Sequence, residues 1–344
     1  MTCYHPMKGF VIGKTENGKK NLKIVPYDTE CVFKPLGSDF WEAHGHVLDH
    51  RVVQGRLVTE FVPIPCGQCI GCRIDYSKQW ATRCMLESQY HDENYFLTLT
   101  YDELNVPHSE YIDYETGEIK DILTLHKKDL QDFNKRLRRA LEYRGRDGFR
   151  FYACGEYGSV SARPHYHMIA FGLHLDDLVK YKDSHAGVLY NSPFLDKIWN
   201  KGHVVIGQVT YESCAYVSRY IMKKQKGKNA DVYSYYNIVP EFTVMSRKPG
   251  IARRYFEDHI ESIYPSDHIV ISGGRCVKPP RYFDSLMEKL DEELMDEVKF
   301  IRKDVAESIN NYKLTLSSAD YQQQLVHAER NAESRLKKLV RPVE

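Results

Sequence analysis

Residues 95–101 read Tyr-Phe-Leu-Thr-Leu-Thr-Tyr, and this stretch is the strongest strand signal in the chain. Its apolar and β-branched side chains alternate, which is typical of a central β-strand. Asp102 and Pro107 then end the strand. The same kind of pattern predicts three further strands, over residues 150–155, 165–173 and 203–210.

Helices are predicted between and before these strands. Leu130, Phe133 and Leu137 recur at the spacing of one helix face, and arginines occupy the opposite side. Similar spacing predicts helices over residues 73–90 and 211–225. The order strand, helix, hairpin, strand, helix lacks a regular alternation. We therefore expect an α+β fold with an antiparallel sheet covered by helices.

Pattern and composition divide the sequence into three regions. Residues 1–90 have weak periodicity, contain a cysteine cluster and end in a helix. Residues 91–281 contain the predicted strands and form the core. Residues 282–344 follow a pair of prolines and have helical spacing, so they predict an α-helical C-terminal appendage with helices over 282–311 and 320–339.

Length and composition exclude several classes of protein. The chain has 344 residues, of which 42% are hydrophobic and 28% charged, as in soluble globular proteins. This length excludes a disulfide-stapled miniprotein. The longest apolar stretches fall far short of the ~20 residues that a membrane helix needs, and the first ten residues lack an apolar signal core. We expect a cytosolic protein with no membrane contact.

The charge of the chain is unevenly distributed. The 48 basic and 47 acidic residues leave a net charge of +1. Residues 282–344 hold ten basic and thirteen acidic residues, so this region carries −3 and the remainder +4. Two segments are basic. Residues 127–150 contain nine basic and four acidic residues, and residues 219–254 contain nine basic and two acidic residues. Each segment is a candidate for contacts with phosphate groups, or a solvated face.

A histidine pair, His165-Tyr166-His167, follows Pro164 and opens a predicted strand. Side chains at i and i+2 of a strand project from the same face, so the two imidazoles point together. If residues 150–155 form the neighbouring strand, Glu156 lies opposite His165. This would give an open site with three metal ligands; the alternative is a solvated strand end. A second pair, His44 and His46, lies in a segment without periodicity.

Two tyrosines and a lysine share one face of the helix predicted over 211–225. Tyr216 and Tyr220 lie one turn apart, and Lys223 follows on the same side. At about 100° per residue, the apolar residues of this helix cluster 100° to 160° around the helix axis from Tyr216. The face is either functional or a surface aromatic pair beside solvated lysines.

Three cysteines, Cys66, Cys69 and Cys72, form a compact cluster in a chain with nine cysteines and no export signal. Their spacing favours a structural zinc site over a disulfide framework. The fourth ligand is open among Cys3, Cys31, His50 and Cys84, with Cys3 the first choice. Buried free thiols and an iron–sulfur cluster are the alternatives.

These motifs together resemble a known family. The stretch Phe96–Tyr101, the histidine pair after Arg163 and Pro164, and Tyr216-x-x-x-Tyr220-x-x-Lys223 follow the order of the three motifs of HUH endonucleases. The chain is most similar to the rolling-circle replication initiators of gokushoviruses, a branch of the microviruses, over roughly residues 66–224. The resemblance implies a five-stranded antiparallel sheet with the histidine pair on a central strand and the tyrosine helix alongside.

The resemblance also implies an activity. Such proteins nick single-stranded origin DNA through a 5′-phosphotyrosine intermediate and later rejoin it, with Tyr216 and Tyr220 alternating as nucleophiles. Lys223 would stabilise the phenolate or the phosphate. His165, His167 and, as our candidate, Glu156 would hold Mg²⁺ or Mn²⁺. The expected partners are phage origin DNA, a host helicase and a host DNA polymerase, in the cytoplasm of a bacterial host.

DNA contacts are expected from the two basic segments, and tyrosines at 233, 235 and 236 could stack on unpaired bases. The candidate phosphate-binding residues are Arg136, Arg138, Arg139, Arg219, Lys224, Lys226 and Lys228. Three other interpretations stay open. They are an HUH transposase or relaxase, a zinc-containing single-stranded DNA-binding protein without catalysis, and an iron oxygenase with two histidine ligands and one carboxylate.

Overall fold

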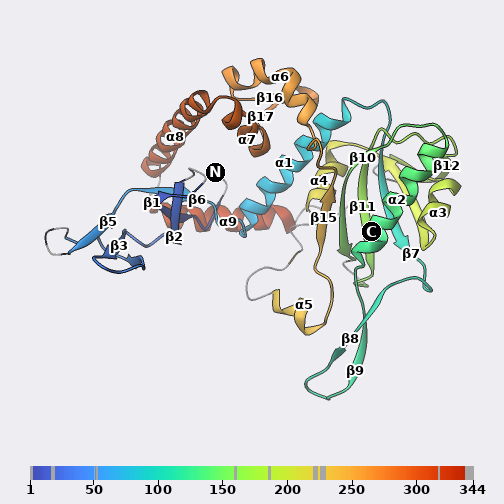
Figure 1. Ribbon diagram of the computed structural model, residues 1–344, viewed down its shortest axis with the longest axis horizontal. Helices are drawn as coiled ribbons and strands as arrows, with labels where there is room; N and C mark the ends of the chain where they lie inside the picture. Colours follow the sequence, from blue (N-terminus) through green and yellow to red (C-terminus); the bar gives the residue numbers. More distant parts are fainter. Residues whose placement is uncertain are drawn as a thin grey trace. The chain divides into compact units, whose positions relative to one another are not determined.

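The computed structural model describes residues 3–16, 20–49, 51, 53–158, 161–184, 187–219, 224, 230–316 and 318–337 (Figure 1). The chain forms two compact units. Unit 1 comprises Met1–Asp75 and Leu314–Val340, and unit 2 comprises Tyr76–Lys313 and Arg341–Glu344. In the described part of the chain, no helix is both long and apolar enough to cross a membrane.

Unit 2 is built on a seven-stranded sheet whose paired strands are all antiparallel. This confirms the predicted α+β class with an antiparallel sheet. In spatial order the strands are β12 (Val179–Ser184), β13 (Gly187–Asn191), β14 (Gly202–Gln208), β7 (Asn94–Tyr101), β11 (Pro164–Phe171), β10 (Arg150–Tyr157) and β15 (Phe242–Met245) (Figure 1). The resemblance implied five strands; the hairpin of β12 and β13 extends one edge to make seven.

One face of this sheet is covered by α2 (Lys127–Tyr143) and α3 (Pro193–Trp199). The apolar face predicted for α2 is buried there, with Leu130, Phe133 and Leu137 fully inside. They pack against alternate residues of β7, such as Leu97 and Leu99, which are also fully buried. Residues 95–101 therefore lie in a central strand, and its leucines belong to this core.

The opposite face is covered by α1 (Ile70–Ser88) and α4 (Tyr211–Arg219). Trp80 of α1 stacks on Tyr152 of β10, with the ring centroids 4.6 Å apart. Cys214 and Val217 of α4 are fully buried against the same face. The helix predicted over 211–225 is thus present as far as the chain is described continuously.

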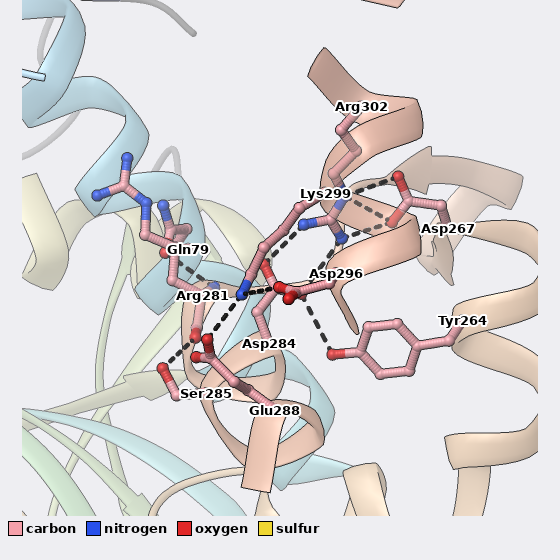
Figure 2. Close-up of polar contacts among 10 residues, drawn as sticks. All are labelled: Gln79, Tyr264, Asp267, Arg281, Asp284, Ser285, Glu288, Asp296, Lys299 and Arg302. Carbon is pink, nitrogen blue, oxygen red and sulfur yellow. Dashed lines mark hydrogen bonds and ion pairs between the residues drawn. The ribbon is translucent and has the colours of Figure 1, made fainter. Parts of the chain in front are cut away.

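A second core of unit 2 lies around α6 (Arg253–Ser266), the hairpin of β16 (Ile269–Ile271) and β17 (Arg275–Val277), α7 (Arg281–Leu290) and α8 (Glu292–Thr315). Arg302 of α8 binds the carboxylates of Asp267 and Asp284, as Figure 2 shows. The sequence predicted one helix over 282–311. The helix is broken at Asp291, whose carboxylate accepts a hydrogen bond from the Leu294 main-chain N–H and so begins α8.

Smaller elements complete unit 2, namely the hairpin of β8 (His108–Ile112) and β9 (Ile119–Leu123), the short helix α5 (Asp231–Tyr235) and a 3₁₀ turn at Ser272–Gly274. Exposed and half-buried tyrosines of the hairpin contact those of α5; the ring centroids of Tyr111 and Tyr235 are 5.9 Å apart. Ser109 of β8 also donates a hydrogen bond to the Asn237 carbonyl.

In its described residues, unit 1 contains six strands and the helix α9 (Tyr321–Lys337). Its two three-stranded sheets have the orders β2-β1-β6 and β4-β3-β5. The strands are β1 (Met7–Lys14), β2 (Lys20–Pro26), β3 (Cys31–Pro35), β4 (Glu42–His44), β5 (Gly55–Val58) and β6 (Phe61–Ile64). The C-terminal region is helical as predicted, but α7 and most of α8 belong to unit 2 while α9 belongs to unit 1. A separate helical appendage is therefore not confirmed.

Candidate functional site

The candidate site lies on the sheet face that α1 and α4 cover. In the register of β10 and β11, Glu156 pairs with His165. His165 and His167 alternate with Tyr166, which belongs to the core on the opposite face. Strand pairing therefore brings one carboxylate and two imidazoles together on one side, as the sequence pattern predicts.

The three side chains converge on one carboxylate oxygen. Oε1 of Glu156 lies 2.6 Å from Nε2 of His165 and 3.1 Å from Nε2 of His167. Nδ1 of His165 lies 3.1 Å from the main-chain carbonyl of Arg163. A carbonyl only accepts hydrogen bonds, so Nδ1 donates to it, which leaves Nε2 to donate to Glu156 in this structure or to offer its lone pair to a bound metal.

Glu156 is buried, with 1% of its surface exposed. Burial raises the pKa of this carboxyl group, but the hydrogen bonds from His165 and His167 outweigh burial and lower the pKa to about 2. The carboxylate is thus ionised at neutral pH and supplies the negative charge of the site.

This donor set could hold a metal ion. The ligand atoms of Glu156, His165 and His167 all lie within 4.8 Å of one another. Two imidazole nitrogens and one carboxylate oxygen suit a divalent cation, with Mn²⁺ accommodating imidazole better than Mg²⁺ does. Three protein ligands leave coordination positions open for a substrate.

Tyr216 of α4 lies directly beside these ligands. Its ring centroid is 5.2 Å from that of His167, with the ring planes at 76°, and 6.1 Å from that of Phe96. Of the other residues proposed on this helix or just after it, Tyr220, Lys223, Lys226 and Lys228 lie outside the described residues, as does the side chain of Arg219. Lys224 is described and half-buried.

A second cluster lies in unit 1, where Cys3 joins Cys66, Cys69 and Cys72. The sulfur atoms of Cys66 and Cys72 are 4.0 Å apart, and so are those of Cys69 and Cys3. About this separation is expected of thiolates at ~2.3 Å from one tetrahedral zinc ion. The four residues could therefore hold a metal.

Main-chain N–H groups point at the sulfur atoms of this cluster. The N–H groups of Tyr4 and Cys66 donate to the sulfurs of Cys69 and Cys3, each at 3.3 Å. Burial raises the pKa of the Cys69 thiol, but hydrogen bonds from main-chain N–H groups and neighbouring thiols lower it to about 7. One thiolate is thus available near neutral pH, which favours metal uptake.

Two comparisons with known proteins agree. A family model for replication-associated proteins of the ORF2 type matches residues 94–225. The chain is 35% identical to Replication-associated protein ORF2 of Spiroplasma virus 4 over 308 residues, which cover 88% of this chain and 91% of that protein. The chain belongs to the replication-associated proteins of microviruses. This confirms the family that the three motifs indicate.

Other members of the family give the same result. Replication-associated protein VP4 of Bdellovibrio phage phiMH2K is 31% identical over 284 residues, 80% of this chain and 84% of that protein. Replication-associated protein ORF4 of Chlamydia phage 1 is 31% identical over 237 residues, 67% of this chain and 55% of that protein. No solved structure matches. The family match of this replication-associated protein begins at β7 and contains Glu156, both histidines and Tyr216.

The arginines proposed for phosphate contacts on α2 of this replication-associated protein lie over the sheet face opposite the site. Arg136 donates hydrogen bonds to the carbonyls of Ile198 and Trp199, at 2.9 and 3.1 Å, which close the end of α3. Arg138 lies over the rings of Phe149 and Phe151, and Arg139 donates to the Tyr143 hydroxyl. Periodicity predicted their helix but not which face of the sheet it covers.

The other candidates for the fourth cysteine ligand lie elsewhere. Cys31 donates a hydrogen bond to the His46 carbonyl, and Cys84 is buried beneath α4. His50 lies outside the described residues. The sequence carries no local signal for Cys3, because 63 residues separate it from Cys66.

Sequence reasoning missed two residues of β7 that contact the site. Phe96 stacks on His167 with ring centroids 5.4 Å apart, and the Thr98 hydroxyl lies 3.0 Å from Nδ1 of His167. A signal was present, since both residues alternate with the buried leucines of the strand and so share the opposite face.

Proposed function

We propose that this protein initiates rolling-circle replication by nicking single-stranded phage origin DNA and later rejoining it. One observation supports the proposal most directly. The Tyr216 phenol lies beside His167, and His167 belongs to a set of three ligands that suits a divalent metal. The family assignment supports an initiator over a transposase or relaxase.

The reaction would be a transesterification at phosphorus. A free tyrosine has a pKa of ~10 and is a weak nucleophile at neutral pH. A divalent ion at Glu156, His165 and His167 would polarise the phosphate and offset its developing charge. Tyr216 would form an O–P bond while the bond from phosphorus to the 3′-oxygen breaks. The phenol proton leaves, and the 3′-oxygen gains a proton.

The products account for replication. The 5′ end stays on the tyrosine as a phosphate ester, and the free 3′-OH primes a DNA polymerase of the host. Attack of a 3′-OH on the phosphotyrosine would later reform the DNA strand. Two tyrosines suit this cycle, since Tyr220 could cut the regenerated origin while Tyr216 holds the displaced end.

Adduct formation tests the proposal. The full chain is incubated with Mn²⁺ and single-stranded origin DNA, and covalent adducts are mapped by mass spectrometry. We expect an adduct on Tyr216 or Tyr220, adducts in each single Tyr→Phe variant, and none in the double variant. Tyr211→Phe, on the same helix, is the matched control. Undiminished adducts in the double variant would overturn the assignment.

The cysteine cluster supports a second proposal, a structural zinc ion held by Cys3, Cys66, Cys69 and Cys72. Elemental analysis of the purified protein tests it, and less than half an equivalent of zinc or iron would contradict a metal. The same cluster fits a zinc-containing single-stranded DNA-binding protein without catalysis. Only the enzyme leaves a covalent adduct, so the experiment above separates the two functions.

A further inference from the structure

The outer face of β7 contacts the candidate metal ligands. In the register of β7 and β11, Thr98 pairs with His167 and Thr100 pairs with His165. The leucines between them face the other side of the sheet. The motif residues Phe96 and Thr98 therefore contact His167, although the proposed reaction assigns them no role, while Thr100 shares their face of the strand.

The two nitrogens of His167 have different neighbours. Nε2 faces Oε1 of Glu156 at 3.1 Å, and Nδ1 faces the Thr98 hydroxyl at 3.0 Å. A neutral imidazole carries one proton, and the nitrogen that binds a metal must be the one without it. For Nε2 of His167 to bind a metal, the proton must lie on Nδ1 and needs an acceptor there.

For His165, the acceptor beside Nδ1 is a main-chain group, the Arg163 carbonyl at 3.1 Å. His167 has a side-chain acceptor instead. A hydroxyl can accept or donate, so the Thr98 oxygen accepts from Nδ1 when Nε2 binds a cation. A substitution can therefore remove the acceptor beside Nδ1 of His167. No side-chain substitution removes the main-chain carbonyl beside Nδ1 of His165.

The surroundings of His167 leave its ring little freedom. The residue is 3% exposed, Phe96 stacks on one side with ring planes at 16°, and Tyr216 meets the ring edge to face at 5.2 Å. Packing thus fixes the plane of the imidazole, but ring stacking by itself does not distinguish its two tautomers. The Thr98 hydroxyl supplies that distinction.

We propose that Thr98 is a positioning residue that, when a cation takes the place of the hydrogen bond between Nε2 and Glu156, holds His167 in the tautomer with the proton on Nδ1 and the Nε2 lone pair toward the metal. The inference rests on the proposed function, because it concerns the same metal site. Partners of this kind are worth about 10–100-fold in metal affinity. Thr98→Val keeps the shape of the side chain and removes the acceptor.

Mn²⁺ affinity of the full chain, measured by electron paramagnetic resonance of the free ion, tests the proposal. We expect Thr98→Val to weaken binding about 10–100-fold and Thr98→Ser to restore it. Thr100→Val is the matched control, since Thr100 lies on the same face and donates to the His203 carbonyl at 3.2 Å. Unchanged affinity in Thr98→Val would overturn the role of Thr98, whereas a wild type that binds no Mn²⁺ would overturn the proposed function.

A second measurement applies even where Thr98→Val does not fold. Nitrogen-15 NMR of labelled histidines in the wild type distinguishes a protonated from an unprotonated ring nitrogen. The proposal requires that Nδ1 of His167 carries the proton in the protein loaded with Zn²⁺, a diamagnetic probe of the same donor set. A proton on Nε2 would contradict it.

Discussion

The two candidate metal sites of this chain differ in the number of protein ligands that they bring together. In unit 1, four cysteine sulfurs gather, and main-chain N–H groups donate to them. In unit 2, three ligands gather beside the phenol of Tyr216. Closed sets of four ligands are typical of structural zinc, and sets of three leave room for a reacting group.

We therefore expect folding to depend on the site in unit 1 and chemistry on the site in unit 2. Four thiolates use all the positions of a tetrahedral ion, so nothing remains for a substrate. The ligands of unit 2 lie on paired strands, whose main-chain hydrogen bonds do not involve a metal. Loss of metal should therefore unfold unit 1 and leave unit 2 folded but inactive. The predictions below test this division.

The largest effect is expected from Cys69→Ser. Structural zinc sites contribute about 10–16 kcal/mol of apparent binding free energy to folding. We expect this variant to lose its zinc and the cooperative unfolding of unit 1, measured by elemental analysis and by hydrogen exchange of residues in β1 and β3. Cys276→Ser, at an exposed thiol, is the control. Protection in unit 1 equal to that of the wild type would break the comparison.

Glu156→Gln should lower the activity of unit 2 but leave its fold in place, whereas Cys69→Ser should affect folding. The substitution keeps the size of the side chain and removes the negative charge that the cation requires. We expect nicking of origin DNA to fall at least about 100-fold, while protected amides in the sheet show by hydrogen exchange that unit 2 stays folded. Glu103→Gln, an exposed carboxylate paired with Arg163, should retain activity. Wild-type rates in Glu156→Gln would exclude this carboxylate as a ligand.

The stability of the metal-free protein should depend on pH through Glu156. Its pKa is lowered from 4.5 to about 2 in the folded state, so the carboxylate stabilises the fold above about pH 4.5. This stabilisation is lost as the pH falls toward 2. Denaturant unfolding should give about 2 kcal/mol less stability from this group at pH 3 than at pH 6, and Glu156→Gln should lack that increment. Equal pH dependence in both proteins would contradict the prediction.

The smallest effect is expected from charge reversal on α2. Arg139 is exposed on the sheet face away from the site, so Arg139→Glu should not change the nicking rate at saturating DNA. If α2 contacts phosphates, each lost contact should reduce the slope of log affinity against log salt by about 1. An unchanged slope would remove α2 from the DNA-binding surface.

Much of unit 2 could be predicted because its signals are local. Alternation placed β7, and the periodicity of Leu130, Phe133 and Leu137 placed α2. The pairing of Glu156 with His165 followed from a short hairpin connection. These inferences need only neighbours in sequence, and the structure bears out the α+β class they predict.

The remaining features depend on contacts between distant residues. The strands of unit 1 lack strong periodicity, and β2, β5 and β6 contain only one buried residue between them. No pattern shows that β12 and β13 extend the sheet, or that α2 covers the face away from His167. The break at Asp291 had a signal, an acidic cap within a helical pattern, which continuous periodicity outweighed.

The connection between β10 and β11 supplies none of the three ligands, because Glu156, His165 and His167 all lie within paired strands. New chain ends could therefore be opened between Tyr157 and Pro164 without removing a donor atom. Two fragments joined by strand pairing would rebuild the donor set only on association. If the proposed nicking activity resides at these ligands, the hairpin that carries them offers a point at which an engineered dimeriser could control it.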